Sequence, residues 1–271
     1  MKGMFNLMST LDALIFDVDG TLADTERDGH RVAFNRAFAA AGLDWSWTVP
    51  LYGELLKVTG GKERIRYYLD YYNTTFQRPA DLDGFIKQLH TDKTRHYTDM
   101  LAQGMIPLRT GVKRILEEAR SKGVRLAIAT TTTPANITAL LEHSVPPIPE
   151  SWFEVIAAGE IVPVKKPAPD IYQYTLHKMG LRQDQCLAIE DSENGLISAR
   201  QAGLKTVITI NDYTCNQNFS EAALVVDHMG EPGQPFSVLN GGDVNGFNYL
   251  NLELLKHIHA NSLLADLAVK S

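Results

Sequence analysis

The chain has 271 residues, of which 44% are hydrophobic and 21% are charged, and 26 Lys and Arg against 32 Asp and Glu give a net charge of −6. This composition is ordinary for a globular protein and excludes a disordered, collagen-like or coiled-coil chain. The negative charge argues against a nucleic-acid-binding face and against docking on an acidic membrane, and no apolar run approaches the roughly 18 residues of a membrane span.

The cysteines and the amino-terminal stretch indicate a compartment. Two thiols, Cys186 and Cys215, do not make a disulfide framework, and Cys186 lies in an apolar run. The first residues, MKGMFNLMST, contain neither a long apolar stretch nor an A-x-A site, so we do not expect a signal peptide. We therefore expect a reduced cytoplasmic protein.

Short apolar runs alternate with amphipathic stretches along most of the chain. Dense apolar runs are typical of parallel strands that are buried on both faces. They occupy residues 13–16, 124–129, 153–157, 185–189, 205–210 and 223–226. Helical patterns lie between them; one is predicted to begin at Pro169 and Asp170 and to end at Gly180. This alternation predicts an α/β fold, a doubly wound parallel sheet of the Rossmann type.

Residues 26–106 break the alternation, because they carry helical stripes and no convincing strand. The segment is too long for a loop, so we interpret it as an all-helical domain inserted after the first strand. The core would then comprise residues 9–25 and 107–230. Residues 231–271 form an extension that is loop-like at first and helical from about residue 250; we expect its His257 and His259 on an exposed helix face.

The first predicted strand ends in DVDGT, residues 17–21. In open α/β sheets, ligands bind beyond the carboxyl ends of the strands, and two carboxylates two residues apart in extended chain point the same way. The pattern therefore places Asp17 and Asp19 at one reaction point, with a polar turn as the alternative. It is no calcium loop of the EF-hand type, because Leu22 and Asp28 stand where such a loop needs Gly and Glu.

Three further strand ends carry polar motifs. Thr130 opens a run of four threonines, whose hydroxyls and free N–H groups before a helix favour a phosphate site, although a plain helix N-cap is the alternative. Lys166 lies next to prolines just before a helix, where a lone lysine is usually solvated. Glu190 and Asp191 end another strand, as a capped turn or as ligands of a hard metal ion.

Together and in this order, the four motifs resemble those of the haloacid dehalogenase (HAD) superfamily and its phosphatases, over residues 11–227. The resemblance implies a Rossmann-like core with a helical cap and phosphoric monoester hydrolase activity. Asp17 would be the nucleophile that forms an aspartyl phosphate. Asp19 would protonate the leaving alkoxide and later deprotonate the attacking water. Thr130 and Lys166 would hold the transferring phosphoryl group.

The resemblance also implies a Mg²⁺ cofactor, which would bind Asp17, the backbone carbonyl of Asp19, and Asp191, with Glu190 nearby. Charge counting supports this need. With Asp19 protonated, the other three carboxylates and a dianionic phosphate sum to about −5, whereas Mg²⁺ and Lys166 supply about +3. Without the metal, an anionic nucleophile would meet an anionic phosphate in a site of low dielectric constant.

Three stretches of the predicted cap resemble the CbbY branch of the superfamily, which includes xylulose-1,5-bisphosphate phosphatases of carbon-fixing organisms. They are DTERDGHR at 24–31, LYGELL at 51–56 and GGKERI at 60–65. Carried over to this chain, the resemblance implies that Glu26, Tyr52 and Lys62 contact the sugar and its distal phosphate. Thr131 and Thr132 would assist from the core.

The glycine motif of the cap supports a second anion site on its own residues. Gly60 and Gly61 allow the backbone to close on a ligand, and a helix N-terminus beside Lys62 suits an anion. Arg64 follows in the same motif, and we count it among the candidate substrate-binding residues. A helix–turn–helix with solvated charges is the alternative.

The sequence leaves two other functions open. A phosphosugar mutase of the β-phosphoglucomutase type shares all four core motifs, and a non-catalytic regulator could use the same scaffold, although every catalytic position here is filled. We expect a small phosphorylated sugar as the partner, most simply a bisphosphate, and neither a nucleic acid nor a membrane. The sequence does not indicate the oligomeric state.

Overall fold

The computed structural model of the protein describes residues 10–58 and 60–268, the last eight of them as backbone only. The amino-terminal stretch considered above, up to residue 9, lies outside the described residues, as do Thr59 of the segment before the glycine motif and residues 269–271 at the end of the predicted extension.

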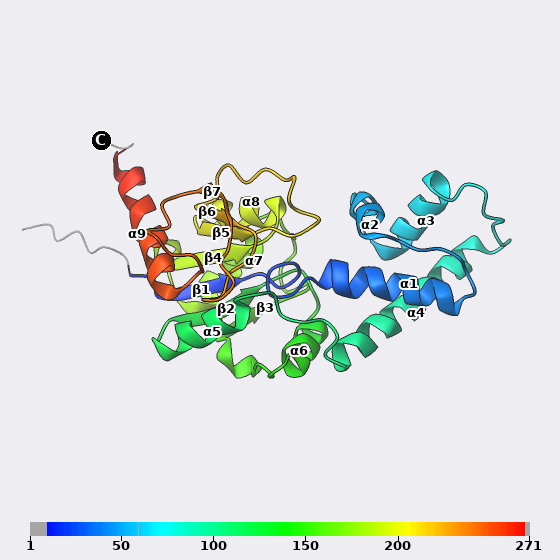
Figure 1. Ribbon diagram of the computed structural model, residues 1–271, viewed down its shortest axis with the longest axis horizontal. Helices are drawn as coiled ribbons and strands as arrows, with labels where there is room; N and C mark the ends of the chain where they lie inside the picture. The colour runs from blue at the N-terminus through cyan, green and yellow to red at the C-terminus, as the bar shows by residue number, and fades with distance from the viewer. Residues whose placement is uncertain (1–9, 59, 269–271) are drawn as a thin grey trace, which may run out of the picture.

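Within the described residues, seven strands form one sheet in the order β3-β2-β1-β4-β5-β6-β7 (Figure 1). All neighbouring strands are parallel except β6 and β7. The bounds are β1 (Ala13–Phe16), β2 (Arg125–Ala129), β3 (Val155–Ala157), β4 (Cys186–Glu190), β5 (Lys205–Thr209), β6 (Leu224–Val226) and β7 (Val238–Gly241). Phe16 of β1 pairs with Ile128 of β2 and Ile189 of β4, so these three strands end at the same edge.

Helices cover the sheet of the core. They are α5 (Val112–Ser121), α6 (Pro134–His143), α7 (Asp170–Met179) and α8 (Glu193–Gln201), with the 3₁₀ turns η2 (Glu150–Trp152) and η3 (Gln183–Gln185). Strand β1 is buried on both faces, because Leu14 and Phe16 belong to one apolar cluster, whereas Ala13 and Ile15 belong to another. This two-sided burial explains why the parallel strands read as dense apolar runs. The predicted doubly wound sheet is thus confirmed.

The cap is entirely helical and stands apart from the sheet in Figure 1. Its elements are the π-helical segment η1 (Thr25–His30) and the helices α1 (Arg31–Ala40), α2 (Val49–Leu55), α3 (Gly61–Tyr71) and α4 (Leu82–Ala102). The cap has its own aromatic core, in which the rings of Phe34 and Phe38 lie 4.6 and 4.9 Å from that of Trp47. The inserted domain therefore has an apolar cluster of its own besides the cluster that it shares with the sheet.

The linker that returns from the cap is tied to the strand ends by Arg109. Its guanidinium donates to the backbone oxygens of Thr209 (2.9 Å) and Asp227 (2.8 Å) and also to that of Gly20. The same side chain forms an ion pair of 3.3 Å with Asp24 in the outgoing linker. Both linkers are thus fixed at the sheet edge where the acidic motifs lie.

The carboxyl-terminal extension corrects two sequence expectations. Strand β7 was predicted as loop, because all of its residues are exposed and it carries no dense apolar run. Helix α9 (Leu252–Ala268) forms as expected, but His259 is 2% exposed, so its predicted exposure was wrong. It lies on the side of α9 that packs on the core, where its backbone oxygen accepts from Lys205. Among the described residues, no helix is long and apolar enough to cross a membrane.

Candidate active site

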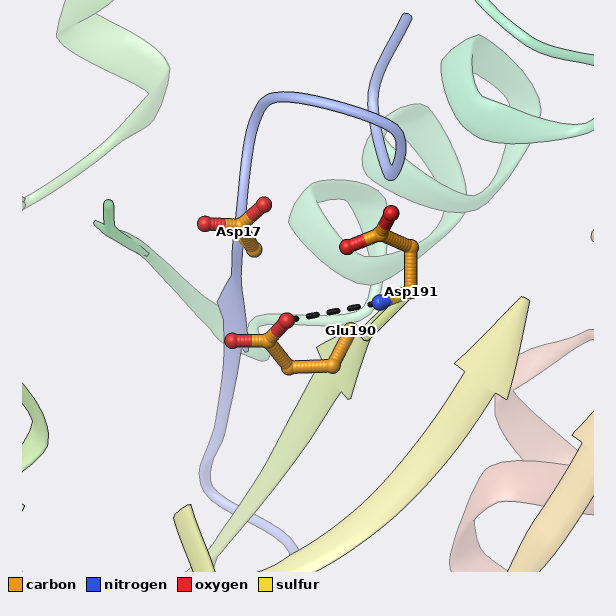
Figure 2. A group of neighbouring side chains, drawn as sticks. All are labelled: Asp17, Glu190 and Asp191. Carbon is orange, nitrogen blue, oxygen red and sulfur yellow. Dashed lines mark hydrogen bonds between the residues drawn. The ribbon is translucent and has the colours of Figure 1, made fainter. Parts of the chain in front are cut away.

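The carboxylates predicted at two strand ends meet in one place. Asp17 directly follows β1, Glu190 is the last residue of the neighbouring β4, and Asp191 comes next. Ligand oxygens of all three lie within 4.8 Å of one another, and all three residues are buried. Figure 2 shows the side chains facing a common space beyond the ends of the strands. The order of the strands brings them together, because β1 and β4 are paired in the sheet.

Lys166 supplies the positive charge of this cluster. Its ammonium donates to Asp17 Oδ1 (2.7 Å), Glu190 Oε1 (2.6 Å) and the backbone oxygen of Ala129 (2.8 Å). Burial disfavours the charged form, but the two carboxylates outweigh it and raise the pKa of Lys166. The side chain is therefore a buried cation beside Asp17, not the solvated lysine that the local sequence suggests.

Glu190 orients Lys166 by accepting a hydrogen bond from its ammonium. Its Oε1 also accepts from the Tyr172 hydroxyl (2.5 Å), and its Oε2 accepts from the Asp191 N–H (3.3 Å). Burial raises the pKa of Glu190 to about 7 although Lys166 opposes this. A Cβ at Gly195 would collide with the carboxylate, so the first turn of α8 can lie this close to Glu190 only with glycine at this position. Because both oxygens already accept hydrogen bonds, Asp17 and Asp191 are the better placed to bind a metal ion.

Asp191 is held by the loop that follows β5. Asn211 Nδ2 donates to Asp191 Oδ2 (2.7 Å). Burial, together with the charges of Asp17 and Glu190, raises the pKa of Asp191. Gly20 passes so close that a Cβ there would collide with the same oxygen, and its φ of +83° also favours glycine. Three buried carboxylates facing one ammonium form an oxygen-rich, anionic site that fits a hard divalent cation.

Asp19 has the protonation behaviour of a general acid. Burial, reinforced by the charge of Asp17, raises its pKa to about 7. Its Oδ1 accepts from the Thr25 hydroxyl (2.6 Å), so the π-helical segment η1 fixes the carboxyl. A carboxyl with this pKa can both hold and release a proton near neutral pH.

The threonine run after β2 is divided between buried and exposed positions. Thr130 is 1% exposed, and its N–H donates to the backbone oxygen of Ala157. Thr132 is also buried and its hydroxyl accepts from Asn136 (3.3 Å), whereas Thr131 is exposed. The hydroxyl of Thr132 lies near Asp19, where it lowers the pKa of that carboxyl slightly.

Three of the predicted cap residues also meet. The Tyr52 hydroxyl donates to Glu26 Oε2 (2.6 Å) and accepts from Arg64 (3.0 Å). Beside them, Lys93 lies 2.8 Å from His30 Nδ1. Burial disfavours the Glu26 carboxylate, but the neighbouring cationic groups lower its pKa overall. This buried network stands at the cap end of a pocket that Glu26 and Asp19 both line.

The first residues of the glycine motif, Gly60 to Lys62, do not line this pocket. Lys62 is exposed at the beginning of α3 and lines a hollow on the cap together with Asp83 and Lys87. Gly60 has a φ of +96°, which only glycine adopts easily, and Gly61 packs closely on the ring of His90. Lys62 is not among the residues that line the pocket at Asp19, and its contact with a distal phosphate stays a prediction.

Several side chains of the site were missed by sequence reasoning. Asn211 follows β5 at the same sheet edge, so the rule that found the acids could have found it. Tyr172 lies on the buried face of α7, and nothing in its local sequence separates it from core packing. Thr25, His30 and Lys93 lie in helical stretches that also look like ordinary amphipathic sequence.

Comparison with known proteins shows to which family the chain belongs. The sequence profile of haloacid dehalogenase-like hydrolases matches residues 11–203. The chain belongs to this family. It is 48% identical over 225 residues to the plasmid form of protein CbbY from Cupriavidus necator, a match that covers 83% of the chain and 88% of the relative. The resemblance inferred from the motifs is therefore confirmed, and this HAD member is a phosphoric monoester hydrolase of the CbbY type.

Solved structures agree with this HAD assignment. CbbY from Rhodobacter sphaeroides, in complex with phosphate, is 42% identical with a TM-score of 0.67, covering 81% of this chain and 95% of that one. A mutant of the same protein, with the same identity, coverage and TM-score, was crystallised with xylulose 1,5-bisphosphate. Both the Rossmann-like HAD core and its helical cap are thus shared with a CbbY structure.

Proposed function

We propose that this protein is a Mg²⁺-dependent phosphatase that removes one phosphate from xylulose 1,5-bisphosphate through an aspartyl phosphate. The observation that carries the proposal is the pairing of two aspartates in different surroundings, one bound to an ammonium and the other with a raised pKa. Asp17 is held by the Lys166 ammonium at 2.7 Å, whereas Asp19 has a pKa of about 7. One carboxyl is thus suited to attack and the other to transfer a proton.

In the first step, a carboxylate oxygen of Asp17 attacks phosphorus and the bond from phosphorus to the sugar oxygen breaks. Asp19 gives its proton to the leaving alkoxide, and the sugar departs as an alcohol. In the second step, Asp19 takes a proton from water, whose oxygen attacks phosphorus and releases phosphate from Asp17. Lys166, Thr130 and Thr132 would hold the phosphoryl oxygens in both steps.

Asp17 and Asp191 would hold the Mg²⁺, together with the backbone oxygen of Asp19. The cation would offset the excess of carboxylates and polarise the phosphoryl group. Among the described residues this cluster meets the requirement for oxygen ligands, since Asp17, Glu190 and Asp191 lie within 4.8 Å of one another. Glu190 would act mainly by holding Lys166, because its oxygens accept three hydrogen bonds.

The cap supports a sugar with a second phosphate. Glu26 and Tyr52 offer hydrogen-bonding groups for sugar hydroxyls, and Arg64 offers a buried guanidinium. Glu26 lines one pocket with Asp19 and Asp191 of the core, and Tyr52 and Arg64 lie behind Glu26, so a substrate with phosphates at both ends could bridge core and cap. Closure over such a substrate would exclude water other than the attacking molecule. The xylulose 1,5-bisphosphate found with the R. sphaeroides CbbY mutant has this form.

The test is a turnover experiment with the full chain, xylulose 1,5-bisphosphate and Mg²⁺, in which free phosphate and sugar products are measured together. We expect one phosphate for each bisphosphate consumed, a xylulose monophosphate as the second product, and no turnover in EDTA. Isomerised sugar phosphate without free phosphate would instead show a mutase. Full activity in EDTA would overturn the metal assignment, and preference for an unrelated phosphate ester would overturn the substrate.

A further inference from the structure

The loop after β5, residues 211–214, connects the metal site with the cap. Within it, Asn211 uses both ends of its side-chain amide: Nδ2 donates to Asp191 Oδ2 (2.7 Å) and Oδ1 accepts from the backbone N–H of Tyr213 (2.9 Å). Thr214 completes the turn, because its hydroxyl accepts from the Asn211 N–H (3.0 Å). The orientation of the Asp191 carboxylate therefore depends on the backbone at Tyr213.

The ring of Tyr213 leaves the core and packs on cap helix α2. It meets the Tyr52 ring edge-to-face with 5.7 Å between centroids, and it packs against the aromatic core of the cap. In Figure 1, α2 lies on the side of the cap toward the core. A Cβ on Gly53 would come within 3.2 Å of Tyr213 Cδ1, so the glycine allows this close approach.

These contacts form a continuous path. Tyr52, which touches the Tyr213 ring, also bonds Glu26 and Arg64, the cap residues assigned above to the substrate. At the other end of the path, Asn211 holds Asp191. Arg27 adds a second tie, an ion pair of 2.9 Å to Asp212, but both partners are well exposed and the pair contributes little to stability.

We propose that Tyr213 is a positioning residue that couples the place of the cap to the orientation of the metal-binding carboxylate Asp191. The cap holds the ring, the ring fixes the backbone N–H of Tyr213, and that N–H fixes the amide of Asn211. Because a cap movement must separate α2 from the ring, the metal site is complete only while the cap is docked. This inference rests on the proposed function, which takes Asp191 as a metal ligand.

The experiment measures Mg²⁺ affinity of the full chain without substrate, by titration calorimetry. Removing a group that orients a metal ligand typically weakens metal binding about 10-fold or more. We expect Asn211→Ala to weaken Mg²⁺ binding by roughly 10-fold and Tyr213→Ala by roughly 3-fold. Tyr213→Phe keeps the ring contacts and should bind as the wild type does.

A double-mutant cycle tests the path. If Tyr213 acts through Asn211, the double variant Asn211→Ala/Tyr213→Ala binds Mg²⁺ no more weakly than Asn211→Ala alone. Wild-type affinity of Tyr213→Ala, or full additivity of the two effects, would overturn the proposal. Gly53→Ala perturbs the same contact from the cap side while favouring the helix, so it should fold and weaken Mg²⁺ binding by roughly 2-fold.

Activity distinguishes this inference from the proposed function. With xylulose 1,5-bisphosphate, Tyr213→Ala should lose kcat at limiting Mg²⁺ and recover it at saturating Mg²⁺, which a merely unstable protein would not do. If the wild type fails to hydrolyse this sugar but Tyr213→Ala still weakens Mg²⁺ binding, only the substrate assignment fails. If the wild type hydrolyses it and Mg²⁺ binding is unchanged in Tyr213→Ala, only the coupling fails. A wild type that binds no Mg²⁺ overturns both.

Discussion

The core and the cap assemble their polar side chains in different ways. In the core, Asp17, Lys166 and Asp191 come from distant parts of the chain, yet they converge because neighbouring parallel strands end at one sheet edge. Cap helices have no such shared edge. Of the cap residues proposed from one sequence motif, Arg64 turns into a buried network while Lys62 is exposed. Motif position therefore predicts placement in the core much better than in the cap.

The two regions also differ in charge. At the core, three buried carboxylates face one ammonium, which favours a cation. At the cap, the Glu26 carboxylate faces the cationic groups of Arg64 and Lys93, which favours an anion. A phosphorylated sugar bound between them would bring a second phosphate toward the cap while the metal ion neutralises the core. The comparison predicts that core variants impair all substrates, whereas cap variants discriminate among them.

The largest effect should come from Asp17→Asn. The amide keeps the shape but cannot attack phosphorus, so we expect kcat to fall by about 10⁴-fold or more on every phosphate ester. The free energy of unfolding should change little, because removing one of the three clustered negative charges also relieves the repulsion among them. The matched control is Asp12→Asn, which lies just before the same strand at its opposite end. Wild-type turnover by the Asp17 variant would reject the mechanism.

The second-largest loss of activity is expected for Asp191→Ala. We expect a loss of about 100-fold or more at limiting Mg²⁺, with partial recovery in excess Mg²⁺, because a ligand is lost but the nucleophile remains. Asp227→Ala is the matched control, since it follows β6 at the same sheet edge outside the cluster. A defect that excess Mg²⁺ leaves unchanged would contradict a ligand role for Asp191.

Lys62→Ala tests the cap directly. Loss of one charge-assisted contact, worth about 1.5–3 kcal/mol, lowers kcat/KM by roughly 10–150-fold. We expect this loss on the bisphosphate and not on p-nitrophenyl phosphate, with Lys57→Ala as an exposed control on the segment after α2. Equal losses on both substrates would show that Lys62 does not act through contact with the distal phosphate. No loss on either would leave Arg64 as the better candidate, because it is buried on the network of Tyr52.

The difference between the regions also explains what sequence could predict. Buried parallel strands are dense apolar runs, so β1 to β6 were found within a few residues, whereas the exposed antiparallel edge strand β7 was not. The acids were found because strand ends mark the site, whereas Lys166, which lies beyond the end of β3, was assigned only through the family resemblance. Tyr172 and Lys93 were not found, because their partners, Glu190 and His30, become neighbours only after the helices pack.

The smallest expected effect concerns the pH dependence of the cap. His30 is buried, which lowers its pKa to about 4; the charges of Lys93 and Arg64 act in the same direction, and Glu26 opposes them. Lys93 lies 2.8 Å from His30 Nδ1, which fits an ammonium donating to a neutral ring. Between pH 6.5 and 4, the unfolded chain therefore binds a proton that the folded protein does not.

The contribution of His30 to the free energy of unfolding is therefore complete above pH 6.5 and is lost as the pH falls toward 4. Between pH 7 and pH 5 we expect the contribution of His30 to fall by about 2 kcal/mol, measured by urea unfolding as the difference between the wild type and His30→Gln. His30→Gln cannot titrate, so over this range its stability should fall by about that much less than the stability of the wild type, or rise by that much more. The raised pKa values of Asp19 and Glu190 act in the opposite direction, since their contributions to stability fall as the pH rises, but both groups are present in the wild type and in His30→Gln and cancel in the difference. Parallel curves for the wild type and His30→Gln would mean that the cap network tolerates a protonated His30. The cap would then lack the excess of positive charge that sets it apart from the core.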